Sequence, residues 1–156
     1  NGIKWTREIW NKMLDIHDLV TDAEVSIDAA TKKTYEKVRI GGDWDQLMKN
    51  LKFIPKEIPW FGISMVVQDT NYKEIPLLIK LRDKLIKESG NKSIYVYFSK
   101  ITNWGTYTDE EYERKAVWKE SHLNYNDFVR ILNENVKKSY WQDKFMGTNM
   151  TDLLRN

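Results

Sequence analysis

Apolar residues recur along the chain at two spacings, one that lines a helix face and one that is typical of strands. The helical pattern predicts helices over residues 6–20, 31–39, 43–54, 71–89 and 126–137. Short apolar or alternating runs between turn residues predict strands over residues 23–28, 60–68 and 93–99. Residues 100–124 have weak periodicity, so we expect an irregular segment there.

Polar residues that can cap a helix precede three of these segments. Thr31 and Asp43 are placed to accept hydrogen bonds from the first turn of the helix that follows each of them. Asn71 and Glu74 have the three-residue spacing of a capping box. Pro76 conflicts with a helix that begins at Asn71, because its ring falls just past the first turn. A later helix start would remove this conflict.

The order of elements predicts the fold class. Strands that alternate with amphipathic helices imply right-handed crossovers and a parallel sheet, so we expect an α/β fold with three parallel strands. A sheet this small leaves an edge strand with open backbone groups, which the tail or another chain would cover. We expect one domain over residues 1–156, in which an irregular and helical extension over 106–156 follows the sheet-forming part at approximately 1–105.

Composition narrows the range of partners. The 156 residues are 41% hydrophobic and 31% charged, as in an ordinary globular domain. Lys and Arg number 25 against 23 Asp and Glu, a net charge of +2 that argues against a nucleic-acid partner. The sequence has no run of 18 apolar residues and no signal-peptide pattern at its start. We therefore expect no membrane partner and a cytoplasmic location.

The numbers of cysteines and histidines limit the metal sites and catalytic residues that this sequence can form. The sequence has no cysteine, which excludes disulfides, thiolate zinc sites, cysteine nucleophiles and any iron–sulfur cluster held by thiolates of this chain. Its two histidines, His17 and His122, lie far apart in sequence and do not suggest a multi-histidine metal site or a Ser/His/Asp triad. We therefore assign no metal ligand and no catalytic residue.

Polar residues follow each predicted strand, where ligands bind in parallel α/β folds. The selected positions are Ser26, Asp28, Gln68, Asp69, Asn71, Ser99, Lys100, Thr102 and Asn103. A hydroxyl beside a carboxylate suits a ligand with hydroxyl or amine groups. Arg39, on the helix after the first strand, can hold a ligand carboxylate through two parallel hydrogen bonds.

Each of these residues also has a purely structural interpretation. Asp28 can cap the turn before Thr31, and Asn71 can cap a helix, without either binding a ligand. Arg39 can be a surface residue. The seven tryptophans mostly fall on predicted helix faces or strands, where core packing is their usual role. The pattern alone leaves both interpretations open.

Four stretches resemble one known family. Residues 24–43, EVSIDAATKKTYEKVRIGGD, resemble the fourth strand and following helix of radical S-adenosylmethionine enzymes. They are most similar to the group related to SPASM and twitch-domain proteins, in which a stretch such as SIDGAT..TY..IR.GG recurs. Residues 66–74 and 97–105 resemble the fifth and sixth strands with their exits, and 147–154 resemble a family tail. The initial Asn1-Gly2 turn resembles the turn after the third strand, so we expect a piece of a longer protein.

This resemblance implies a partial (β/α)₆ TIM-like barrel that binds S-adenosylmethionine and a 4Fe-4S cluster, and that cleaves the former reductively to a 5′-deoxyadenosyl radical. Carried over to this sequence, Ser26 and Asp28 face the ribose or methionyl part, and Arg39 lies near the carboxylate. Residues 66–71 and 98–100 flank the adenosine. The resemblance thus implies cofactor contacts at Ser26, Asp28, Arg39, Gln68, Asn71 and Ser99.

The sequence departs from the family in one decisive respect. The three cysteines that bind the cluster, in a CxxxCxxC loop after the first strand, are absent. We therefore expect the carboxyl-terminal half of a barrel, inactive alone and with no cofactor bound alone, whose partner is the missing amino-terminal half or a second copy of itself.

Two other functions stay open. The chain can be a non-enzymatic half-barrel that serves binding or assembly, as a homodimer for example. It can also be a hydrolase or lyase that uses Asp28 and Asp69 as paired carboxylates, although no histidine or metal motif supports that pair.

Overall fold

The structure is a computed structural model that describes residues 2–142, 150 and 152–154, and the side chains of all of these except 136–142. The helices and strands follow in the order α1 (Arg7–Asn11), η1 (Leu14–Leu19), β1 (Asp22–Ser26), α2 (Lys32–Val38), α3 (Trp44–Leu51), α4 (Ile54–Glu57), β2 (Trp60–Val67), η2 (Tyr72–Glu74), α5 (Ile75–Ser89), β3 (Ile94–Lys100), α6 (Asp109–Lys115) and α7 (Tyr125–Gln142), where η marks a 3₁₀ helix.

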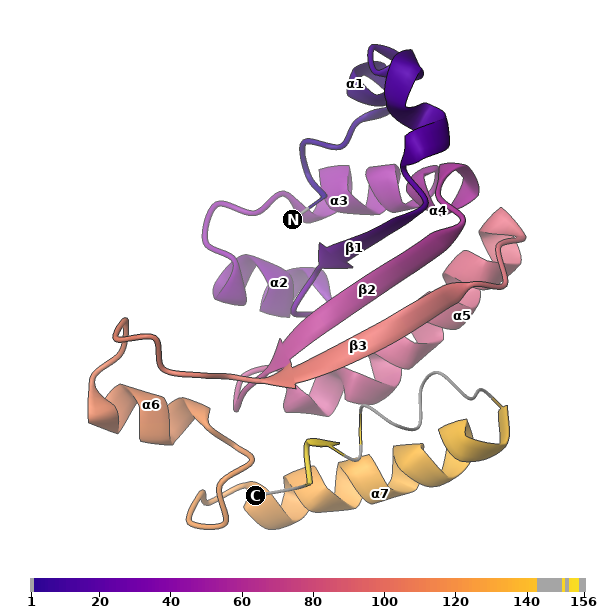
Figure 1. Ribbon diagram of the computed structural model, residues 1–156. Helices are drawn as coiled ribbons and strands as arrows, with labels where there is room; N and C mark the ends of the chain where they lie inside the picture. The colour runs from indigo at the N-terminus through magenta and orange to yellow at the C-terminus, as the bar shows by residue number, and fades with distance from the viewer. Residues whose placement is uncertain (1, 143–149, 151, 155–156) are drawn as a thin grey trace.

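The three strands form one parallel sheet in the order β1-β2-β3 (Figure 1). The register pairs Ser26 with Ser64, and Ser64 with Tyr97, so that all three carboxyl ends lie at one edge of the sheet. The predicted α/β class with a three-stranded parallel sheet is confirmed.

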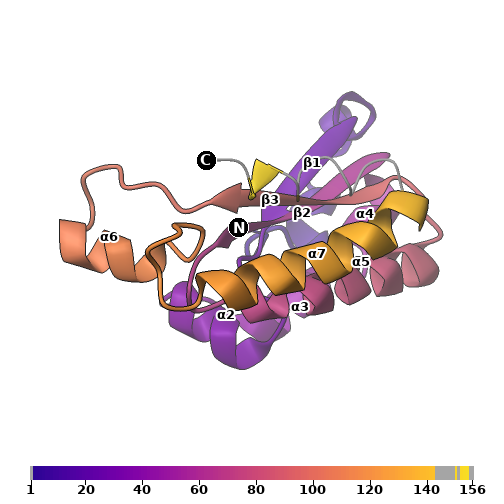
Figure 2. The same cartoon turned by 90° about the horizontal axis from the view of Figure 1, so that it is seen from below.

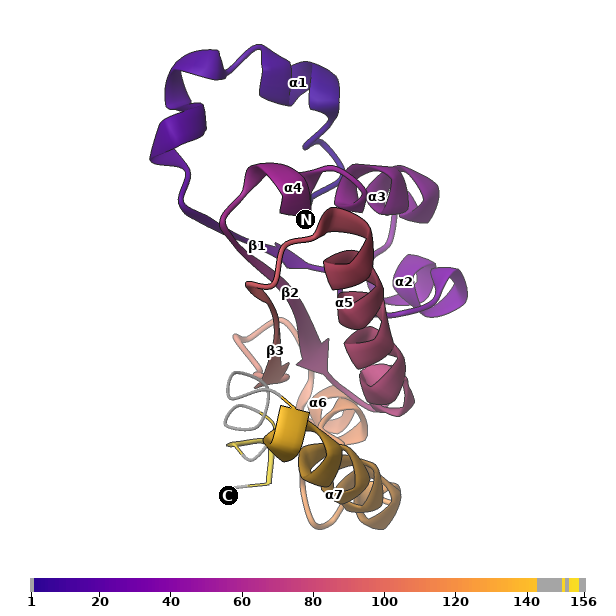
Figure 3. The same cartoon turned by 90° about the vertical axis from the view of Figure 1, so that its right-hand side faces the viewer.

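One face of the sheet carries the core. Alternate side chains of β2, from Phe61 through Ile63 and Met65 to Val67, are fully buried. Figures 2 and 3 show α2, α3 and α5 on the same side of the sheet, as right-handed crossovers require. The other face bears Ser64, and beside it on β3 Tyr97, which is 46% exposed. Ser64 is buried on this face, whereas the ring of Tyr97 reaches solvent.

The single helix predicted over residues 6–20 is wrong. The chain forms the short helix α1 and then the 3₁₀ helix η1. The carbonyl of Trp10 accepts hydrogen bonds from the backbone N–H of Met13 (2.9 Å) and from the Nε2–H of His17 (2.8 Å). The His17 ring also stacks on the Trp10 ring, with centroids 3.9 Å apart. These contacts replace the regular α-helical ladder after residue 11.

Two of the three predicted caps are confirmed. The side chain of Thr31 accepts from the backbone of Thr34, and that of Asp43 accepts from the backbone of Gln46. The capping box at Asn71 is wrong, because α5 begins at Ile75 and holds its proline in the first turn. A proline is tolerated there because the first N–H groups of a helix have no partner within it.

The carboxyl-terminal part is more regular than predicted. The segment expected to be irregular contains α6, which begins with a capping box between Thr108 and Glu111. Helix α7 runs over Tyr125–Gln142, where the pattern predicted 126–137 and an irregular tail from residue 140. Residues 143–149, 151, 155 and 156 of that tail, which include half of the family-like stretch 147–154, lie outside the described residues, as does Asn1.

Candidate functional site

A serine, an aspartate and an arginine meet where β1 ends. Arg39 Nη2 lies 2.6 Å from Asp28 Oδ2 and donates to Ser26 Oγ at 2.5 Å. Asp28 Oδ1 accepts from the backbone N–H of Val66 (2.8 Å) and from the Ser26 hydroxyl (3.3 Å). Three predicted site residues therefore form one network at the carboxyl ends of β1 and β2.

Asp28 has a backbone conformation that fixes its direction. Its φ is 60°, in the left-handed region, which aspartate tolerates better than most residues. Its N–H donates to the carbonyl of Ser64, and its own carbonyl accepts from the side-chain amide of Asn71. Asp28 is thus held through its backbone as well as through its carboxylate, which favours a preorganised site.

The alternative role for Asp28, as the cap of the turn before Thr31, is wrong. That turn is capped by the carboxylate of Glu74, which lies more than 40 residues away. Its Oε2 accepts from the backbone N–H groups of Ala30 (2.6 Å) and Thr31 (3.0 Å). Its Oε1 accepts from the hydroxyls of Thr31 (2.6 Å) and Thr34 (2.5 Å). Glu74 therefore positions the start of α2, and Asp28 is left for the network with Arg39.

Arg39 ends α2 and points back over the sheet edge. Its side chain is 24% exposed, so it is not an ordinary surface arginine. Nη2 is engaged with Asp28 and Ser26, whereas the buried Nε has no hydrogen-bond partner among the described residues. A buried donor in this state is destabilising unless something else accepts from it.

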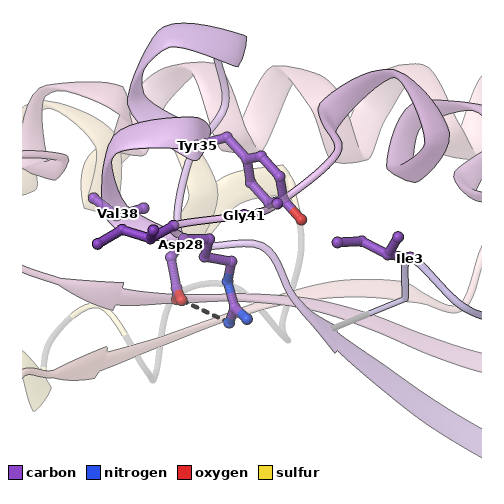
Figure 4. Close-up of a pocket in the computed structure, with 8 residues that line it drawn as sticks. Ile3, Asp28, Tyr35, Val38 and Gly41 are labelled. Atoms are coloured by element: carbon purple, nitrogen blue, oxygen red, sulfur yellow. Dashed lines mark ion pairs between the residues drawn. The ribbon is translucent and has the colours of Figure 1, made fainter.

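A cavity of about 380 Å³ adjoins this network (Figure 4). It is lined by Ile3, Asp28, Tyr35, Val38, Arg39, Ile40, Gly41 and Gly42. The dashed line in Figure 4 marks the ion pair between Asp28 and Arg39 at its wall. The cavity thus combines an ion pair, a phenol and a glycine turn.

A second cavity, of about 430 Å³, shares Asp28 and Val38 with the first. It is lined by Asp28, Val38, Val66, Gln68, Ser99, Lys100, Ile101, Thr102, Trp104, Thr106 and Tyr107. The structure therefore brings Gln68 and Ser99, both predicted from sequence, to the same hollow as Asp28. The two cavities adjoin along the edge where the strands end.

Asn71 lies below this edge. It is fully buried, and its amide donates to the carbonyls of Asp28 and Val66 while its oxygen accepts from the backbone of Gln68. Its observed role is to tie the exits of β1 and β2 together.

Asp69 lines neither cavity, and its carboxylate accepts from the hydroxyl of Thr70. The geometry therefore gives no support to paired carboxylates at Asp28 and Asp69.

Sequence reasoning missed the aromatic residues of both cavities. Trp104 lines the second cavity and is 85% exposed, whereas the sequence pattern favours core packing for most of the tryptophans. Its loop is held by Asn103, whose side chain accepts from Gly105 N and donates to the Tyr107 carbonyl. A tryptophan between an asparagine and a glycine just after a strand was the available signal.

Lys100 is one of the residues that line the second cavity. Burial lowers the pKa of Lys100 from its usual value, and the nearby carboxylate of Asp152 partly opposes this shift. Its ammonium lies 4.7 Å from the ring centre of Trp118. The ammonium therefore lies over a ring that is not part of the cavity lining, whereas the hydroxyl-bearing residues Ser99, Thr102 and Thr106 line the cavity together with Asp28.

Comparison of the chain with protein-family models, with curated proteins and with solved structures finds no match. Within the described part of the chain, no three His, Cys, Asp or Glu side chains gather as a metal site would require. Among the same residues, no helix combines the length and apolar character needed to cross a bilayer.

Proposed function

We propose that this chain is the carboxyl-terminal half of a radical S-adenosylmethionine barrel, and that its sheet edge contributes to the binding of S-adenosylmethionine. The observation that carries the proposal is the Ser26, Asp28 and Arg39 network between two adjoining cavities at the strand ends. The resemblance of residues 24–43 to the family supports the same assignment.

The chemistry of the ligand fits the residues present. S-adenosylmethionine has a charged amino-acid end and a nucleoside end, joined through a sulfonium. Arg39 offers its buried Nε–H to the carboxylate, and the Asp28 carboxylate and Ser26 hydroxyl suit the ammonium or the ribose hydroxyls. The second cavity, with Gln68, Ser99 and Trp104 in its walls, suits the nucleoside end.

The 4Fe-4S cluster of the family does not fit this chain. The sequence has no cysteine, so it offers no thiolate for the cluster irons. We therefore assign only ligand binding to these residues.

Titration calorimetry of the chain with S-adenosylmethionine tests the proposal. Because the chain alone is not expected to retain the cofactor, we expect only weak, saturable binding with a Kd of roughly 1 mM, which is worth about 4 kcal/mol. Arg39→Met should weaken it at least about tenfold, since it removes charge-assisted hydrogen bonds. Arg130→Met is the matched control, because Arg130 also pairs with acidic groups but lies on α7. No saturable binding to the wild type, or equal affinity in Arg39→Met, would contradict the proposal.

A second candidate function, assembly, is favoured by aromatic exposure on the sheet face opposite the helices. Trp60 is 47% exposed and Tyr97 is 46% exposed, and strand alternation places both on the face of Ser64. Aromatic side chains are enriched at protein interfaces. Sedimentation velocity at tens of micromolar should then show a dimer that Tyr97→Ser weakens. A monomer at all concentrations would exclude self-assembly through this face.

A further inference from the structure

The phenol of Tyr35 is the least satisfied polar group of the first cavity. Tyr35 is 0% exposed, and its hydroxyl finds no hydrogen-bond partner in the part of the chain that the structure describes. Buried hydroxyls are nearly always hydrogen-bonded, because leaving one without a partner is destabilising. Tyr35 therefore needs an explanation that the packing of the chain alone does not provide.

The hydroxyl faces the cavity rather than the core. Tyr35 lines the hollow of about 380 Å³ together with Ile3, Asp28, Arg39 and the turn at Gly42. Figure 4 shows its oxygen turned towards Ile3. The oxygen is closed to solvent as the side chains stand, so a ligand group contacts it when the cavity wall beside Ile3 gives way.

The ring is held in this direction by its neighbours. It packs against Trp44, with ring centroids 5.4 Å apart. On another side, a Cβ added to Gly42 would lie 2.6 Å from Cε1 of Tyr35, so the chain passes the ring at a distance that only glycine permits. The phenol thus has little freedom to turn towards another partner, which preorganises it for a ligand.

The hydrogen-bond donors at the cavity indicate which chemical group of a ligand would bind there. Burial raises the pKa of Tyr35, with the charge of Arg39 as a smaller opposing effect, so the phenol stays protonated and donates at neutral pH. The buried Nε of Arg39 is a second donor at the same cavity, and the Asp28 carboxylate is already paired with Arg39. Two donors whose acceptors are not supplied by the described residues suit an oxyanion with two oxygens, and a carboxylate has this form.

We infer that Tyr35 is a ligand-binding residue whose hydroxyl donates to the carboxylate of an α-amino-acid group bound in this cavity, beside Arg39 Nε. The inference rests on the proposed function for the identity of the whole ligand. It goes beyond that function because it assigns the amino-acid end to one cavity and gives Tyr35 a role.

Tyr35→Phe tests the inference through three ligands measured by calorimetry or NMR titration. We expect S-adenosylmethionine and free L-methionine each to bind about tenfold more weakly to this variant. Binding of 5′-methylthioadenosine, which has no carboxylate, should stay within about twofold of the wild type. Tyr95→Phe, on β3 and outside both cavities, is the matched control and should change none of the three.

Stability provides a readout that a purely structural tyrosine would not give. Removing a hydroxyl that lacks a partner should leave the urea midpoint of Tyr35→Phe equal to or above that of the wild type. A lower midpoint would show that the hydroxyl bonds within the protein and would overturn the inference.

The outcomes separate this inference from the proposed function. If S-adenosylmethionine binds and Tyr35→Phe leaves its affinity unchanged, the inference fails and the function stands. If only L-methionine binds, and more weakly to Tyr35→Phe, the function fails and the inference stands. If neither ligand binds the wild type, both are wrong.

Discussion

Replacement of Glu74 should loosen the start of α2, because its single carboxylate accepts four hydrogen bonds there. Two of the donors are backbone N–H groups, of Ala30 and Thr31, and two are threonine hydroxyls. In Glu74→Ala these donors lose their acceptor. In Glu74→Gln the remaining carbonyl oxygen can still accept from the two N–H groups, but without the negative charge.

The magnitude follows from the number of bonds and their burial. A hydrogen bond to a charged group contributes about 1.5–3 kcal/mol when buried. The groups around Glu74 are half-buried, so water can replace part of the lost acceptor. We expect Glu74→Ala to lower the free energy of unfolding by about 2–4 kcal/mol, and Glu74→Gln by about 1–2 kcal/mol.

Urea unfolding followed by circular dichroism measures these values. Glu88→Gln is the control, because Glu88 lies on α5 and is 42% exposed, with only Lys84 at 3.7 Å as an ion-pair partner. Its loss should change the free energy of unfolding by less than about 0.5 kcal/mol. If both Glu74 variants also fall within about 0.5 kcal/mol of the wild type, the four bonds do not hold α2 in place and the reasoning is refuted.

Two further predictions concern α7 and the second cavity. Burial, and then the hydrogen bond and charge of Asp127, raise the pKa of Tyr72 to about 12. The folded state therefore holds this proton more tightly than the unfolded state, whose pKa is near 10, so stability is intact below about pH 10 and falls by up to about 3 kcal/mol towards pH 12. Urea midpoints at pH 9 and 11.5 should show a smaller fall in Tyr72→Phe than in the wild type, and equal falls would contradict this. Trp104→Ala should weaken binding of 5′-methylthioadenosine about tenfold by loss of stacking, whereas Trp104→Phe should keep most of the affinity. Calorimetry measures both affinities, and equal binding by the two variants would exclude stacking on Trp104.

The parallel sheet was predictable because its signals are local. The run from Ile63 to Val67 is apolar except at Ser64, close to the pattern of buried parallel strands, and helical segments separate it from the other two strands. The caps at Thr31 and Asp43 also depend only on residues three positions away. The capping box at Thr108 was readable in the same way, and the weak apolar periodicity of its segment obscured it.

The features that the sequence did not predict depend on contacts between residues that are not neighbours in a local pattern. Glu74 has the spacing of a local cap, but its partners lie 40 or more residues earlier. The break after α1 comes from a contact between His17 and Trp10 that apolar periodicity does not encode. Of the site, the strand-end rule predicted that Asp28, Gln68 and Ser99 lie together, because parallel strands end at one edge. Arg39, at the end of α2, was instead selected for its ability to hold a carboxylate.

The close approach at Gly42 limits how this region can diverge. A side chain at position 42 would meet the Tyr35 ring, and its Cβ would also lie 2.8 Å from the backbone oxygen of Arg39. A smaller residue at position 35 would relieve only the clash with the ring. The clash with the backbone oxygen of Arg39 would remain, so no substitution at position 35 lets position 42 accept a side chain. Position 35 itself carries no such backbone restriction. Chains that descend from a common ancestor with this one can thus retune what the hollow accepts by exchanging the aromatic residue, while the glycine beside it stays invariant.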